Sequence, residues 1–138
     1  MQKVNKFIFN YIKIYDLESQ LKTQRGEDKR PYGVGLLVAG YDSSGPRLFR
    51  TCPSGNYYEY QSIAIGSRCQ SSNTYLEIKF DEVKNADSME ALIKLAIGAM
   101  KKSQDHDITA DNIDVSVVGE KQEFKVLSKT ELSAYFVI

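Results

Sequence analysis

The sequence is poor in the residues that build disulfide frameworks, zinc sites and catalytic triads. Its 138 residues contain no tryptophan, one histidine and two cysteines. Cys52 and Cys69 have no CxxC spacing, so two free thiols in a reducing compartment, buried or half-buried, are expected. The histidine, His106, lies in a polar loop between Asp105 and Asp107, which favours an exposed side chain over a catalytic one.

An excess of charge of one sign is also lacking. Lysine and arginine number 18, and so do aspartate and glutamate, so no overall field attracts nucleic acid or anionic lipid. No apolar run approaches the roughly 18 to 20 residues that a membrane helix needs. No signal-peptide cleavage site follows the N-terminus. With 42% hydrophobic and 26% charged residues, the composition predicts an intracellular, soluble globular protein.

Two patterns that resemble ligand sites are better explained as structure. Asp105, Asp107 and Asp111 have the look of a calcium loop, but the required glycine and closing glutamate are missing. Gly33 and Gly35 lie within an expected strand rather than ahead of a helix, so close backbone packing is favoured over phosphate binding. We therefore expect no metal and no cofactor.

A third pattern, an aromatic cluster, could bind single-stranded nucleic acid. Tyr57, Tyr58 and Tyr60 lie in one expected strand, near Arg47 and Arg50. Bases stack on such aromatic side chains when a basic groove holds the backbone. Because the net charge is zero, cross-strand aromatic packing is the favoured interpretation.

The first part of the chain predicts one helix and an antiparallel meander. Residues 4–24 fit a helical stripe, although their aromatic and β-branched residues also allow a strand. Apolar runs punctuated by tight turns then predict strands over residues 33–41, 47–52 and 57–65. The nearly continuous apolar character of residues 33–41 predicts burial on both faces.

The second part predicts helices followed by a hairpin. A helix is expected over about residues 67–81, starting either at Ser67 or at the Thr74 capping-box spacing. Residues 87–102 carry a clear apolar stripe behind an Asp87 N-cap. Strands over residues 112–118 and 123–127 and a short terminal helix that docks through apolar residues complete an α+β layered fold. Those docking residues are Leu132, Tyr135 and Phe136.

Several motifs follow one another in a specific order. They are RPYGVGLLVAGYD at residues 30–42, GP at 45–46, PSG at 53–55, IGSRCQ at 65–70 and TYLE at 74–77. In this order they closely resemble the alpha-type subunits of the 20S proteasome, over about residues 23–136. The order of the whole set makes the resemblance specific, since no one motif is distinctive alone.

The resemblance implies a fold and a role. It implies the N-terminal-nucleophile hydrolase fold, in which two antiparallel sheets lie between helical layers. It implies a non-catalytic subunit of a seven-membered alpha ring, which docks on the beta ring and receives regulatory particles during ATP- and ubiquitin-dependent protein degradation. Such subunits lack the catalytic threonine of the beta type, need no cofactor, and act in the cytoplasm and nucleus.

The resemblance is to the C-terminal portion of the family only, so residues 1–138 are expected to form a single partial domain. Half of a sandwich leaves apolar surface uncovered, so the chain alone is expected to self-associate. Two alternatives stay open: a threonine-type peptidase of the same fold, and an independent peptide- or RNA-binding module. The residues expected to shape the architecture and the subunit contacts are Arg30, Pro31, Tyr32, Gly33, Gly35, Gly66, Arg68, Gln70, Thr74, Tyr75, Leu76 and Glu77.

Overall fold

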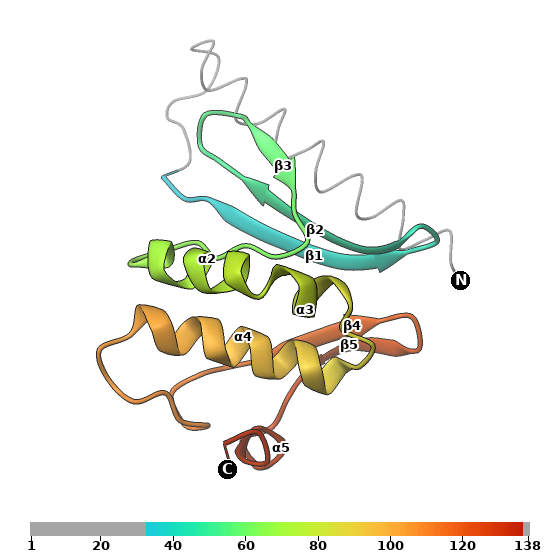
Figure 1. Ribbon diagram of the computed structural model, residues 1–138. Helices are drawn as coiled ribbons and strands as arrows, with labels where there is room; N and C mark the ends of the chain where they lie inside the picture. The colour runs from blue at the N-terminus through green and yellow to red at the C-terminus, as the bar shows by residue number, and fades with distance from the viewer. Residues whose placement is uncertain (1–32, 137–138) are drawn as a thin grey trace. The chain divides into compact units, whose positions relative to one another are not determined.

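The computed structural model describes residues 33–136 (Figure 1). The helix expected over residues 4–24 lies outside this range, as do Arg30, Pro31 and Tyr32. Within the described range, three strands are followed by three helices, a two-stranded hairpin and a short helix. The expected α+β class with antiparallel sheets is confirmed. No helix in this range is both long and apolar enough to cross a membrane.

The chain divides into two compact units, which we describe separately. The described part of the first unit comprises residues 33–60 with 118–121. The second comprises residues 61–117 and the chain from 122 onward.

A three-stranded antiparallel sheet forms the first unit. Its strands are β1 (Leu36–Asp42), β2 (Gly45–Thr51) and β3 (Tyr57–Glu59), in that spatial order. The β1–β2 turn is tight because the backbone N–H of Ser44 donates to the Asp42 carboxylate at 2.6 Å and because Gly45 takes a φ of 110°.

Aromatic packing across β2 and β3 supports the structural interpretation of the tyrosine cluster. Phe49 is buried, and its ring meets that of Tyr57 edge to face, with 6.4 Å between centroids. Arg47 donates to the Glu59 carboxylate at 2.6 Å, so part of the positive charge beside the cluster is neutralised. Tyr58 is exposed and lies opposite Arg50 in the register.

Three expectations for this sheet are wrong in detail. Strand β1 begins at Leu36, so Gly33 and Gly35 precede the strand rather than lie within it. Leu36 and Leu37 are 39% and 41% exposed, so β1 is not buried on both faces. It pairs with β2 alone among the described strands, so it lies at the edge of the described sheet. Strand β3 ends at Glu59, because the chain bends at residues 61–62 instead of extending to 65.

The second unit is built on a pair of packed helices. Helix α2 (Cys69–Ile78) lies beside α4 (Met89–Ser103), and the short α3 (Phe80–Lys84) follows α2 (Figure 1). The expected α4 is confirmed, although its N-cap is Ser88, whose hydroxyl accepts from the Ala91 N–H. Helix α2 starts at Cys69, which agrees with the earlier of its two expected starts.

The core of this unit includes the buried face of α4. The hairpin of β4 (Ser116–Gly119) and β5 (Gln122–Val126) and the helix α5 (Lys129–Ser133) follow in the chain. The expected docking of the terminal helix is confirmed: Leu132 is fully buried in the core cluster, and Tyr135 and Phe136 pack against the same cluster. The remaining buried members of the cluster are Ile93, Ile97, Ile108, Ala110 and Ile113.

Candidate functional site

The N-terminal end of α2 carries two of the residues singled out by sequence. Gly66 has a φ of 101°, a conformation that side chains with a Cβ rarely adopt. Arg68 is the N-cap in the left-handed region, with a φ of 58°, and its guanidinium forms an ion pair with Asp105. A non-glycine residue in this region costs about 1 kcal/mol or more. The ion pair therefore ties a strained helix start to the loop after α4.

Asn73 holds the chain segment that leads into α2, a role that no sequence pattern predicted. Its Oδ1 accepts from the Ala64 N–H at 2.8 Å, and its Nδ2 donates to the Ala64 carbonyl at 3.2 Å. Both backbone groups of Ala64 are thus satisfied by one side chain. The partner of Asn73 lies nine residues earlier in the chain, a spacing that belongs to no known motif, so the contact could not be recognised from the sequence.

The contact between α2 and α4 depends on small residues. The hydroxyl of Ser72 is buried and donates to the Ala99 carbonyl at 2.7 Å. A Cβ placed on Gly98 would lie 2.5 Å from the hydroxyl oxygen of Tyr75. The helices therefore approach closely only because position 98 has no side chain. Leu76 is buried in the same helix.

The predicted structural residues fall into separate groups. Seven of them lie on α2 or just before it, and of these Tyr75 and Leu76 point inward. The other five are exposed and so lie on surface that another chain could contact: Gly66, Arg68, Gln70, Thr74 and Glu77. Thr74 is not a cap, since it lies inside α2 and its hydroxyl donates to the Gln70 carbonyl at 3.0 Å.

The two glycines of the first unit differ from each other. A Cβ on Gly35 would lie 3.1 Å from the Thr51 carbonyl oxygen, which is tighter than ordinary contact. A Cβ on Gly33 would come within 4 Å of no other atom of the described residues. The expected close packing therefore applies to Gly35 and not to Gly33.

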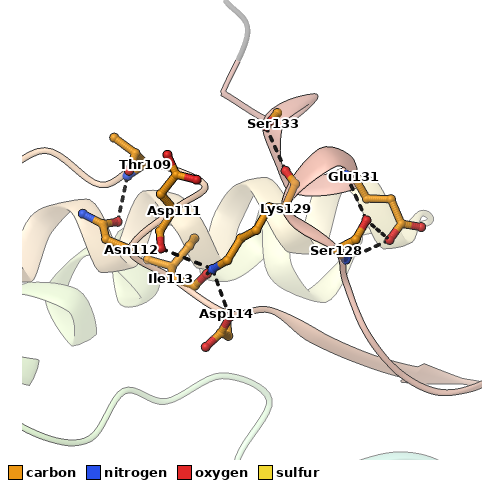
Figure 2. Close-up of polar contacts among 9 residues, drawn as sticks. All are labelled: Thr109, Asp111, Asn112, Ile113, Asp114, Ser128, Lys129, Glu131 and Ser133. Carbon is orange, nitrogen blue, oxygen red and sulfur yellow. Dashed lines mark hydrogen bonds and ion pairs between the residues drawn. The ribbon is translucent and has the colours of Figure 1, made fainter.

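A second polar network holds α5 in place (Figure 2). The Lys129 Nζ donates to the main-chain carbonyl of Ile113 at 2.7 Å and to that of Asp111 at 3.3 Å. It also lies 3.1 Å from the Asp114 carboxylate. One ammonium thus ties the first turn of α5 to a segment at least 15 residues earlier in the chain.

The loop before that segment is braced by a side-chain amide. Asn112 accepts from the Thr109 N–H at 2.9 Å and donates to the Asp107 carbonyl at 2.9 Å. Figure 2 shows the first of these contacts beside the Lys129 network. Turn residues of this kind satisfy backbone groups that no strand or helix pairs.

The N-terminus of α5 has a complete capping box. The Ser128 hydroxyl accepts from the Glu131 N–H, and the Glu131 carboxylate accepts from the Ser128 N–H at 2.9 Å. Lys125 forms an ion pair with the same carboxylate. The contact with Lys125, followed by those with Ser128, lowers the pKa of Glu131 from 4.5 to about 2.

The loop around His106 forms an open hollow of about 640 Å³ in the second unit. His106 is exposed, as predicted, and the carboxylate of Asp105 forms an ion pair with the guanidinium of Arg68. The Lys101 ammonium lies 5.3 Å from the centroid of the Phe136 ring.

In residues 33–136, no three acidic, histidine or cysteine side chains lie close enough together to bind a metal ion. Both cysteines are free and half-buried, as expected.

Comparison with known proteins places these features in a family. A family model described as "Proteasome subunit" matches residues 15–118. The chain is 44% identical over 119 residues to proteasome subunit alpha type-1 of Dictyostelium discoideum. It is 39% identical over 116 residues to a probable proteasome subunit alpha type-6 of Schizosaccharomyces pombe. Proteasome subunit alpha type-2 of Oryza sativa subsp. indica is 37% identical over 106 residues.

The matches cover most of this chain but only part of each relative. In the order given, they cover 84%, 83% and 77% of the chain, and 47%, 42% and 44% of the relatives. The chain therefore spans about half the length of the curated relatives it matches. The aligned parts include the motif residues of α2 and the helix pair that they help to form.

Proposed function

Because the chain belongs to the proteasome subunit family, we propose that it is a non-catalytic alpha-type subunit of a 20S proteasome outer ring, of the type-1 kind. The observation that carries this proposal is the 44% identity to an alpha type-1 subunit over 119 residues. Three features of the sequence favour the same type. They are Tyr32, the Gly40-Tyr41-Asp42 step and the Gly-x-Arg-x-Gln segment ahead of TYLE.

The proposed mechanism is positional. Helix α2 is held in place by its packing against α4. Its outer side carries an exposed polar surface made of Arg68, Gln70, Thr74 and Glu77. Such a surface suits contact with neighbouring subunits, because its polar side chains project from helices whose inner faces are fixed by buried contacts. No step of bond making or breaking is assigned to this chain.

The proposed partners are the other alpha-type subunits of a seven-membered ring, the adjacent beta ring, and regulatory particles that dock on the assembled ring. The proposed role supports ATP- and ubiquitin-dependent protein degradation in the cytoplasm and nucleus. A fluorescent fusion at the native locus should be seen in both compartments, and a signal confined to another organelle would contradict the location.

Co-migration with the particle tests the role. The native gene would be tagged at its C-terminus, and a cell extract would be separated by size on a gradient. The tag should appear in the fractions that contain other alpha and beta subunits and cleave fluorogenic peptides. A tag found only in light fractions, away from those subunits, would refute ring membership.

The proposed lack of catalysis has its own test. The purified 138-residue chain should hydrolyse none of the fluorogenic peptides that the whole particle cleaves. The matched control is the particle itself, assayed with and without a covalent threonine-directed inhibitor. Inhibitor-sensitive turnover by the purified chain would favour the peptidase alternative.

A further inference from the structure

Strand β5 is open on its edge and on both faces. Among the described residues it pairs with β4 alone, so its other side carries backbone N–H and C=O groups without a strand partner. Its last four residues are all exposed, and because side chains alternate along a strand, neither face is covered. Phe124 is 70% exposed and Val126 is 53% exposed. A two-stranded hairpin is marginal in water, so an added strand would stabilise it.

The sequence of β5 indicates which strand would fit. It reads Gln122-Glu123-Phe124-Lys125-Val126 and is self-complementary when two copies run antiparallel with Phe124 at the centre. Glu123 of each copy then lies opposite Lys125 of the other, which gives two pairs of opposite charge. The two Phe124 side chains then lie side by side on the same face of the sheet. Opposite charges and aromatic rings directly across a ladder are the favourable cross-strand pairs.

Other alignments are disfavoured by the same charges. A parallel, in-register pair places Glu123 opposite Glu123 and Lys125 opposite Lys125. An antiparallel pair shifted by two residues also brings two like side chains together at its centre. Like charges directly opposite each other are destabilising, so one register is selected.

The contact between Lys125 and Glu131 is compatible with this pairing. The Lys125 side chain is 47% exposed although its ammonium contacts the Glu131 carboxylate. An ammonium has three donors, so it can contact Glu131 and a second copy's Glu123 together.

We propose that β5 is a self-association edge, through which two copies of this chain pair antiparallel about Phe124 and join their hairpins into a four-stranded sheet. The arrangement is isologous, since the same surface of both copies is used. It assigns a surface to the self-association that is expected because the chain resembles only half of the family's sandwich. The proposal does not depend on the proposed ring function, because the pairing is between two copies of the purified chain and involves no other subunit.

Sedimentation of the full 138-residue chain over a concentration series is the first test. A reversible monomer–dimer equilibrium is expected, with slower amide exchange in β5 as the concentration rises. A monomer at every concentration would overturn the proposal, and so would a dimer in which β5 exchanges as fast as in the monomer.

A charge exchange makes the test specific. Glu123→Lys and Lys125→Glu each place like charges opposite each other, so each variant alone should dimerise about tenfold more weakly. An equimolar mixture should recover the association, since every cross-strand pair between the two variants is again of opposite sign. Unweakened single variants, or a mixture no tighter than either variant, would overturn the register.

A pair of apolar variants covers the case in which a charge variant fails to fold. Phe124→Asp should weaken the dimer at least tenfold, because it removes the central aromatic pair and adds two facing carboxylates. Val34→Asp changes another exposed apolar residue, 56% accessible and outside the second unit, and should leave association unchanged. Equal effects of the two substitutions would overturn the assignment to β5.

Discussion

Replacing Leu132 with alanine should destabilise the second unit strongly. The side chain is 0% exposed and lies in the cluster that includes Ile93, Ile97 and Ile113. Truncating a fully buried leucine removes its transfer free energy and leaves a cavity, which together cost about 2 to 5 kcal/mol. The upper half of that range is expected, because α5 has only five residues and Leu132 is its one buried residue.

Thermal unfolding followed by circular dichroism measures this effect. For a chain of this size, each kcal/mol lowers the Tm by about 3 to 5 °C, so a decrease of at least about 10 °C is expected. The matched control is Leu92→Ala, the same chemical change at a position that is 43% exposed on α4. Its Tm should change by no more than about 2 °C, since an exposed helical alanine is at least as favourable as leucine. If Leu132→Ala were no worse than Leu92→Ala, the core described here would be refuted.

Four further substitutions test other contacts. Gly98→Ala should destabilise by about 1 to 2 kcal/mol despite better helix propensity, and by less when Tyr75→Phe removes the hydroxyl oxygen that it meets; equal costs in a urea-unfolding cycle would contradict the contact. The folded pKa of Glu131 is depressed to about 2, so its contribution is present above about pH 4.5 and is lost as the pH falls towards 2. The Tm of Glu131→Gln should therefore lie below wild type at pH 7 and converge with it in acid; a constant difference would argue against the ion pair and cap. Lys129→Met should speed amide exchange throughout α5, and unchanged exchange would mean that its two carbonyl contacts do not hold the helix. Gly35→Val should lower the Tm because its Cβ lies 3.1 Å from a backbone carbonyl, and an unchanged Tm would contradict that close approach.

The sequence predicted best the elements in which periodicity and local chemistry agree. The apolar series of α4 predicted its face, and Ile93 and Ile97 are buried as that series requires. The hairpin followed from two short apolar runs around the Gly119 turn, although β4 begins at Ser116 and not at residue 112. Helix α5 followed from a start at either Ser128 or Thr130 and the apolar residues behind it, and Ser128 is its N-cap. In each of these elements a local signal and a tertiary contact point to the same structure.

The wrong predictions concern the exposure and the ends of strands, which depend on tertiary contacts rather than on the local sequence. An apolar run such as residues 33–41 has the same pattern in a central strand and in an edge strand, so its exposure could not be read from composition. The end of β3 depends on a bend at residues 61–62 that carries neither glycine nor proline.

The polar contacts that position the candidate site were also missed. Asn73 and Lys129 bridge to main-chain groups 9 and 16 residues away, and such pairs follow no fixed spacing. The motif residues of α2 were identified through the family resemblance, because their spacing alone does not distinguish them from other surface residues.

The proposed ring role predicts a definite stoichiometry. Particles would be purified from the native source through a tagged beta subunit, and peptides from residues 33–136 would be quantified by mass spectrometry against those of the other alpha-type subunits. A ratio of one to one is expected, since each position of the ring holds one subunit. Absence of these peptides from intact, active particles would contradict the account.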